Sequence, residues 1–203
     1  MKPDIIIPTN RTEPYASPIL CDVQGNSFGC RVLATCRDGS AALNRNVGLE
    51  WAESDYIIML DDDTSGFYID WWKDLIQPLV AHEDVCMVSA RLMHPEIPGK
   101  HGKMMFQGNI AAHISEVPQV PTACCSFRRD SLRFDESFIG SGFEDTFFCE
   151  CKKALCPGSR AVITNSCQIR HRNEEKGQAD NWAVNKGTYD DLMERLKAGE
   201  YPL

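Results

Sequence analysis

The feature that most constrains this chain is an apolar segment, residues 56–60, which ends in three consecutive acids, Asp61, Asp62 and Asp63. The segment predicts a buried strand, and ligands of open α/β sheets bind beyond the carboxyl ends of the strands. Three adjacent carboxylates repel one another, but Mg²⁺ or Mn²⁺ makes such a cluster favourable because these cations prefer oxygen ligands. A cation site is therefore predicted at a sheet edge, and a solvated acidic turn that caps the next helix is the alternative.

Strand-like and helix-like segments alternate along the rest of the chain. Strands are predicted at residues 4–8, 31–35, 85–91, 106–114, 120–127 and 161–170, and helices near residues 15–21, 40–53, 66–81, 144–155 and 188–199. Such alternation is typical of an α/β fold, in which helices cover a sheet. A Gly/Pro/Lys-rich loop is expected at residues 95–105.

Individual side chains sharpen the prediction for the second helix. Ser40 can cap its start, and the spacing of Leu43, Val47 and Trp51 predicts its buried face. Gly48 lies on another face, where a missing side chain would allow a neighbouring backbone to approach closely.

Two of the three later helices carry their own signals. Pro78 should end or kink the helix over residues 66–81, because proline cannot supply a helical N–H. The adjacent Trp71 and Trp72 could stack on sugars, but at least one of them is expected in the core. Thr188 and Asp191 have the spacing of a capping box and predict the start of the last helix.

Length and charge limit the class of protein. The 203 residues favour one domain, residues 1–203, and 43% hydrophobic with 25% charged residues is ordinary for a globular protein. A net charge of −8 argues against general nucleic-acid affinity and suits a protein that holds a cation. No secretory signal and no apolar run of the ~18 residues needed to span a membrane is recognised, so a cytoplasmic protein is expected. The ten cysteines lack paired zinc-ligand spacing and are interpreted as mostly reduced core residues.

Three groups of segments together resemble a known family. They are residues 5–11, residues 44–49 with 55–63, and residues 134–145 followed by 169–173. In this order they resemble the GT-A fold glycosyltransferases, especially the family-2-like inverting enzymes. The last group also resembles the β-1,4-galactosyltransferases. The resemblance implies an α/β, Rossmann-like mixed sheet flanked by helices, in a compact version.

The resemblance also implies a metal-dependent transfer from a nucleotide-diphospho-sugar, UDP-sugar being the expected donor, with Mn²⁺ (or Mg²⁺) as cofactor. Asp61 and Asp63 match the family's D-x-D motif, which makes Asp63 the metal ligand and Asp61 the residue on the ribose side. Asp62 is also assigned to donor binding, but the sequence does not indicate which way its side chain points. His171 matches the family's late histidine and is expected to complete the metal site. A surface histidine, or one that binds phosphate directly, is the alternative.

An inverting transfer needs a base that takes the proton of the acceptor hydroxyl. By resemblance Asp145 is that base, while Glu144 and Gly142 bind the acceptor. The alternative for the two acids is a purely structural one, because carboxylates at a helix N-terminus are stabilised by the helix dipole.

The remaining donor-binding residues are expected in the first quarter of the chain. Pro8, Thr9 and Arg11 follow or end the first strand, and Arg11 could reach the diphosphate or the base. Asp38 belongs to an Asp-Gly-Ser sequence that resembles the nucleobase contact of family-2 enzymes, although here it directly precedes the helix that carries Asn44. Asn44 is also assigned to donor binding. A solvated arginine is the alternative for Arg11.

Two other functions use related parts. A sugar nucleotidyltransferase would need a glycine-rich phosphate loop after the first strand, and residues 8–12 contain no glycine. A non-catalytic nucleotide-sugar-binding module would keep the fold without turnover. The acceptor, which could be a glycan, a protein or a modified nucleobase, stays open.

Overall fold

The computed structural model describes residues 2–9, 18–94, 109, 111–171 and 178–203. In chain order the described elements are β1 (Asp4–Pro8), α1 (Pro18–Asn26), β2 (Arg31–Thr35), α2 (Ala41–Trp51), β3 (Tyr56–Leu60), β4 (Thr64–Ser65), α3 (Trp71–Ala81), β5 (Val85–Met93), β6 (Ile114–Val117), β7 (Cys124–Arg128), α4 (Glu144–Leu155), β8 (Arg160–His171) and α5 (Gln178–Ala198). The predicted α/β fold is confirmed. The loop over residues 95–105, residues 106–108 and 110 of the strand predicted at 106–114, and Arg11 lie outside the described residues, whereas residues 111–113 form a turn before β6 instead of the predicted strand.

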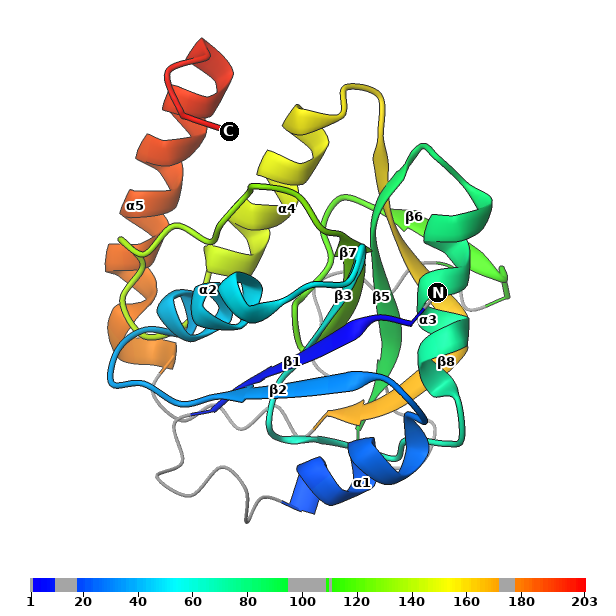
Figure 1. Ribbon diagram of the computed structural model, residues 1–203. Helices are drawn as coiled ribbons and strands as arrows, with labels where there is room; N and C mark the ends of the chain where they lie inside the picture. Colours follow the sequence, from blue (N-terminus) through cyan, green and yellow to red (C-terminus); the bar gives the residue numbers. More distant parts are fainter. Residues whose placement is uncertain (1, 10–17, 95–108, 110, 172–177) are drawn as a thin grey trace.

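The described strands form one mixed sheet in the order β2-β1-β3-β7-β5-β8-β4, and β6 pairs with the first half of β8 (Figure 1). Strands β2, β1 and β3 run parallel, whereas β7 is antiparallel to both of its neighbours, β3 and β5. The parallel strands β1 and β3 both end at the edge where the acidic run begins, so the expected ligand-binding edge exists.

Helices cover both faces of the sheet because the central strands are apolar on both faces. In β1 the side chains of Ile5 and Ile7 enter one core and that of Ile6 enters the other; in β3, Ile58 and Met59 divide in the same way. Helices α1 and α3 pack on the first face and α2, α4 and α5 on the second (Figure 1). All ten cysteines are free thiols, and six of them are buried, as predicted.

Helix α2 begins after its predicted cap, since Ser40 accepts a hydrogen bond from the Leu43 backbone N–H at 3.2 Å. Its buried face differs from the prediction: Trp51 is 49% exposed and Leu43 is only partly buried. The buried face instead contains three polar residues, Asn44, Arg45 and Asn46. Apolar spacing predicted the wrong buried face for this helix, because the inner face carries the polar hydrogen bonds of Asn44, Arg45 and Asn46.

Helix α3 begins later than predicted, at Trp71, because Gly66 and Asp70 have left-handed φ values of 85° and 63°, which a right-handed helix does not contain. Pro78 lies inside the helix and does not end it, and the helix closes with a hydrogen bond from the His82 N–H to the Pro78 carbonyl. Trp71 and Trp72 are both buried, so both belong to the core and neither is free to stack on a sugar.

Helix α5 starts at Gln178, well before the predicted start at Thr188. The Thr188 hydroxyl donates to the Val184 carbonyl within the helix, so it does not act as an N-cap. The helix ends at Ala198, and the next residue, Gly199, has a φ of 73° and closes the helix as predicted. Over the described residues, every helix is too short or too polar to cross a bilayer.

Candidate active site

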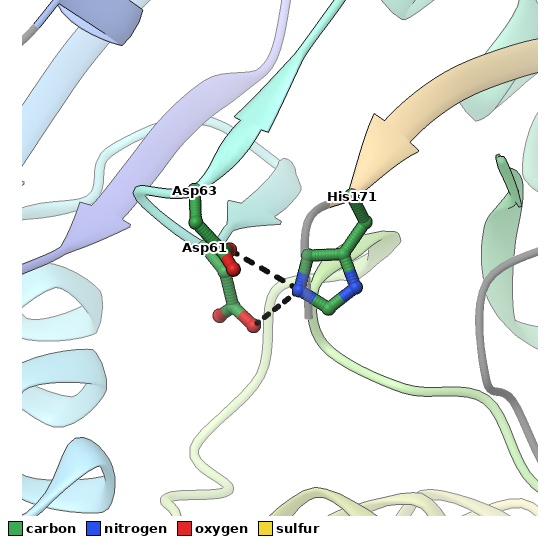
Figure 2. A group of neighbouring side chains, drawn as sticks. All are labelled: Asp61, Asp63 and His171. Atoms are coloured by element: carbon green, nitrogen blue, oxygen red, sulfur yellow. Dashed lines mark ion pairs between the residues drawn. The ribbon is translucent and has the colours of Figure 1, made fainter. Parts of the chain in front are cut away.

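The acidic run folds into a tight turn at the end of β3. The Asp61 backbone N–H donates to the Ala123 carbonyl at 3.0 Å, which continues the pairing of β3 with β7. The backbone N–H and the hydroxyl of Thr64 both donate to the Asp61 carbonyl, at 3.2 and 2.7 Å. This turn places the carboxylates of Asp61 and Asp63 near each other (Figure 2).

His171 reaches the turn through strand pairing. Thr64 of β4 lies opposite His171, the last residue of β8. The His171 Nε2 atom is 3.1 Å from a carboxylate oxygen of Asp63 and 3.9 Å from one of Asp61 (Figure 2). One ligand atom from each of the three residues lies within 4.8 Å of the others, a spacing that one cation can bridge.

The donor set fits a divalent cation. Burial lowers the pKa of His171, but the hydrogen bond to Asp63 and the charges of Asp61 and Asp63 outweigh burial and raise it. This cluster therefore attracts positive charge. Two carboxylates with one imidazole suit Mn²⁺ and Mg²⁺ chemistry better than a soft thiolate metal.

Asp62 points to the end of β1. Its carboxylate accepts a hydrogen bond from the Thr9 hydroxyl at 2.6 Å, and the Thr9 backbone N–H donates to the Thr35 carbonyl at 2.8 Å. Thr9 is buried and directly follows Pro8, the last residue of β1. Thus Pro8, Thr9 and Asp62, all predicted donor-binding residues, lie together at the edge where β1 and β3 end.

Arg45 connects the acidic run to helix α4. Its side chain is buried, and it donates to Asp61 Oδ1 at 3.2 Å and to Glu144 Oε1 at 2.7 Å. Burial lowers the pKa of Arg45, but the charges of Glu144 and Asp61 raise it and keep the guanidinium ionised. The sequence alone indicates no role for Arg45, because only the fold shows which acids surround it.

Glu144 and Asp145 open helix α4, as predicted, after Phe143 in a left-handed conformation with φ of 69°. Glu144 is buried: Arg45 donates to one of its oxygens and the Gly142 backbone N–H to the other. Asp145 is less buried, and its Oδ1 accepts from the Thr146 N–H at 2.7 Å. Burial and the Glu144 charge raise the pKa of Asp145 to about 6, against the opposing effect of Arg45.

Asn44 and Asp38, predicted to bind the donor, lie at the strand-to-helix turn before α2. The Asn44 amide accepts from the Arg37 N–H at 2.7 Å and donates to the Arg37 carbonyl at 2.9 Å, so Asn44 holds this turn. Asp38 is exposed within it. These contacts position the turn, and the donor-binding role of both residues stays a prediction.

The mixed sheet flanked by helices, with the acidic run at the end of β3, is the GT-A fold of glycosyltransferases. The sequence model described as "Glycosyl transferase family 2" matches residues 5–135, and the chain belongs to this family. This confirms the predicted family-2 resemblance. The match covers only the first two residues of the segment 134–145 and ends before Glu144, so the predicted similarity to β-1,4-galactosyltransferases is not shown.

Solved structures share the fold at low sequence identity. "A197 from STIV" is 19% identical, with a TM-score of 0.58 over 86% of this chain and 87% of the other. The mannosyltransferase PcManGT from Pyrobaculum calidifontis, in complex with GDP-Man and Mn²⁺, is 14% identical, with a TM-score of 0.63 over 100% of this chain and 66% of the other. GalNAc-T7 with UDP, GalNAc and Mn²⁺ is 14% identical, with a TM-score of 0.54 over 83% of this chain but only 37% of the other. A search of curated protein sequences gave no match.

Proposed function

We propose that this glycosyltransferase moves a sugar from a nucleotide-diphospho-sugar, with UDP-sugar as the donor class, to an acceptor hydroxyl with inversion and with a divalent cation. The observation that carries the proposal is the cluster of Asp61, Asp63 and His171. The proximity of the cluster to the Glu144–Asp145 pair, through Arg45, supports it further.

Asp63 and His171 are the proposed ligands of Mn²⁺ or Mg²⁺. The bound cation would neutralise the charge that develops on the leaving diphosphate. Asp61 Oδ1 is held by Arg45, whereas its Oδ2 faces His171. In this orientation Asp61 can contact the ribose or a water on the metal, and Asp62 with Thr9 shapes the donor side of the same edge.

Asp145 is the proposed base. Its carboxylate takes the proton of the acceptor hydroxyl as that oxygen bonds to the anomeric carbon from the side opposite the diphosphate. The bond from the anomeric carbon to the diphosphate oxygen breaks, and the electron pair leaves with the phosphate. A pKa of about 6 keeps Asp145 ionised at neutral pH and makes it more basic than an ordinary carboxylate.

Glu144 has a more buried position than acceptor binding requires, with both oxygens engaged by Arg45 and Gly142. We therefore propose that Glu144 acts on the acceptor indirectly, by fixing the backbone at Gly142 and the start of α4. Gly142 has no side chain and a φ of 114°, so its role is to let an acceptor approach the turn before Asp145.

Mn²⁺-dependent hydrolysis of UDP-Glc, UDP-Gal, UDP-GlcNAc and GDP-Man tests the proposal. Wild-type protein should release the nucleoside diphosphate from one of these donors, and Asp63→Ala should abolish the release. Asp55→Ala is the matched control, because Asp55 is an exposed acid just before β3, at its opposite end. Donor binding without any turnover would instead identify a binding module.

A further inference from the structure

Helix α5 holds the turn that leads into the proposed base. The side chain of Asn185 is buried, and its Oδ1 accepts from the Ile139 N–H at 2.9 Å. Its amide group donates to the carbonyls of Ile139, Ser141 and Gly142 at 3.0, 3.3 and 3.1 Å. One side chain of α5 therefore fixes both arms of the turn that precedes α4.

Trp182 lies about one helical turn before Asn185 and reaches the same part of the chain. Its ring centroid is 4.5 Å from that of Phe143, the residue directly before the Glu144–Asp145 pair. The Phe143 ring also lies 5.4 Å from that of Tyr189 on α5. These contacts fix the indole of Trp182, yet the residue stays 55% exposed.

Ile139 in the fixed turn is also 52% exposed. A single exposed apolar residue needs no explanation. Here, however, Ile139 belongs to the turn that leads to the proposed base, and Trp182 contacts Phe143 in the same turn. The other three tryptophans differ from Trp182. Trp71 and Trp72 are buried, and the exposed Trp51 is the last residue of helix α2, before β3 and outside the turn that leads to Asp145.

We propose that Trp182, packed against Phe143, is an acceptor subsite that stacks the apolar face of a pyranose ring. The proposal rests on the proposed function, and it names the acceptor class as carbohydrate. An indole face offers a rigid, large contact area at low entropic cost to the C–H face of a sugar. The sugar hydroxyls at the ring edge stay free to meet water.

Glycan binding tests this subsite without knowledge of the natural acceptor. Labelled protein is applied to a glycan microarray in the presence of UDP and Mn²⁺, and hits are titrated as free oligosaccharides. Wild-type protein should bind a subset of glycans, and Trp182→Ala should bind them about tenfold more weakly, the typical scale for loss of one aromatic contact. Trp182→Phe keeps a ring and should retain most of the binding.

Trp51→Ala is the matched control, since it removes a tryptophan of similar exposure and should leave glycan binding unchanged. The subsite is refuted if wild type binds no glycan, or if Trp182→Ala and Trp51→Ala bind as wild type does. An assay of nucleotide-sugar hydrolysis distinguishes failure of the subsite from failure of the proposed function. A wild type that binds glycans but hydrolyses no nucleotide sugar would contradict the transferase proposal, whereas a wild type that hydrolyses the donor but binds no glycan would contradict the subsite.

Discussion

The donor and acceptor sides of the candidate site are built in different ways. On the donor side, Asp61, Asp63 and His171 stand at strand ends, and backbone pairing of β4 with β8 brings them together. On the acceptor side, long-range side-chain contacts hold the turn before α4, chiefly those of Arg45 and Asn185. The donor side also lies largely within the family match over residues 5–135, whereas the acceptor turn lies beyond it.

This difference explains what the sequence could predict. The apolar segment before Asp61 predicted a strand and an acidic tip, because both signals are local. His171 and Asp145 were predicted through family resemblance, and their roles stay proposals. Arg45 and Asn185 carry no local signal of their function: their partners are distant in sequence, and polar residues inside a helix are normally expected on its exposed face.

The same physical reason accounts for the errors in the helices. Apolar spacing placed Trp51 on the buried face of α2, but that face buries Asn44, Arg45 and Asn46 instead. The start of α5 was missed because its first half is polar and is anchored by Asn185. Helices α2 and α5 therefore depart from amphipathic patterns, whereas the strands that support the donor side follow theirs.

The largest expected effect is on turnover when the acceptor-side base is removed. Asp145→Asn should lower kcat by about 10²–10⁴-fold, the usual contribution of a general base, with donor binding unchanged. For wild type, kcat/KM should fall as the pH drops through about 6, because protonated Asp145 accepts no proton. Steady-state kinetics over pH 5–8 measures both, and undiminished turnover in Asp145→Asn would rule out the base assignment.

The second-largest effect is expected on stability, when Arg45, which joins the donor and acceptor sides, is replaced. Arg45→Met leaves Glu144 and Asp61 without their buried partner and should destabilise the protein by about 3–5 kcal/mol in urea unfolding. Lys186→Met removes an exposed ion pair with Asp190 and should change stability by less than about 1 kcal/mol. Equal losses in the two variants would show that Arg45 does not join the two sides.

Gly48 tests how closely helix α2 must approach the donor-side strands. A Cβ at Gly48 would lie 2.3 Å from Ile6 Cγ2, so Gly48→Ala should cost about 1–3 kcal/mol through overpacking. Gly25→Ala, in α1 with open space around its Cβ, should be neutral or slightly stabilising. Thermal melts compare the pair, and a neutral Gly48→Ala would contradict the close contact.

The smallest effect is a gain in stability. A carboxyl with a raised pKa binds its proton more tightly when folded, so ionised Asp145 destabilises the fold above about pH 6 and ceases to do so below its ordinary pKa of 3.8. Asp145→Asn should therefore stabilise the protein by about 2 kcal/mol at pH 7, and the gain should vanish by about pH 3.5. Urea unfolding at the two pH values measures the difference, and a gain that does not change with pH would point to another cause.

Binding of Mn²⁺ tests the central claim most directly, because it needs neither a known donor sugar nor an acceptor. Electron paramagnetic resonance of free Mn²⁺, titrated with protein and UDP, reports the bound fraction. Wild type and Asp55→Ala should bind one Mn²⁺ per chain with UDP present, whereas Asp63→Ala and His171→Ala should bind at least about tenfold more weakly. Equal Mn²⁺ affinity in all four proteins would contradict a metal site at Asp61, Asp63 and His171.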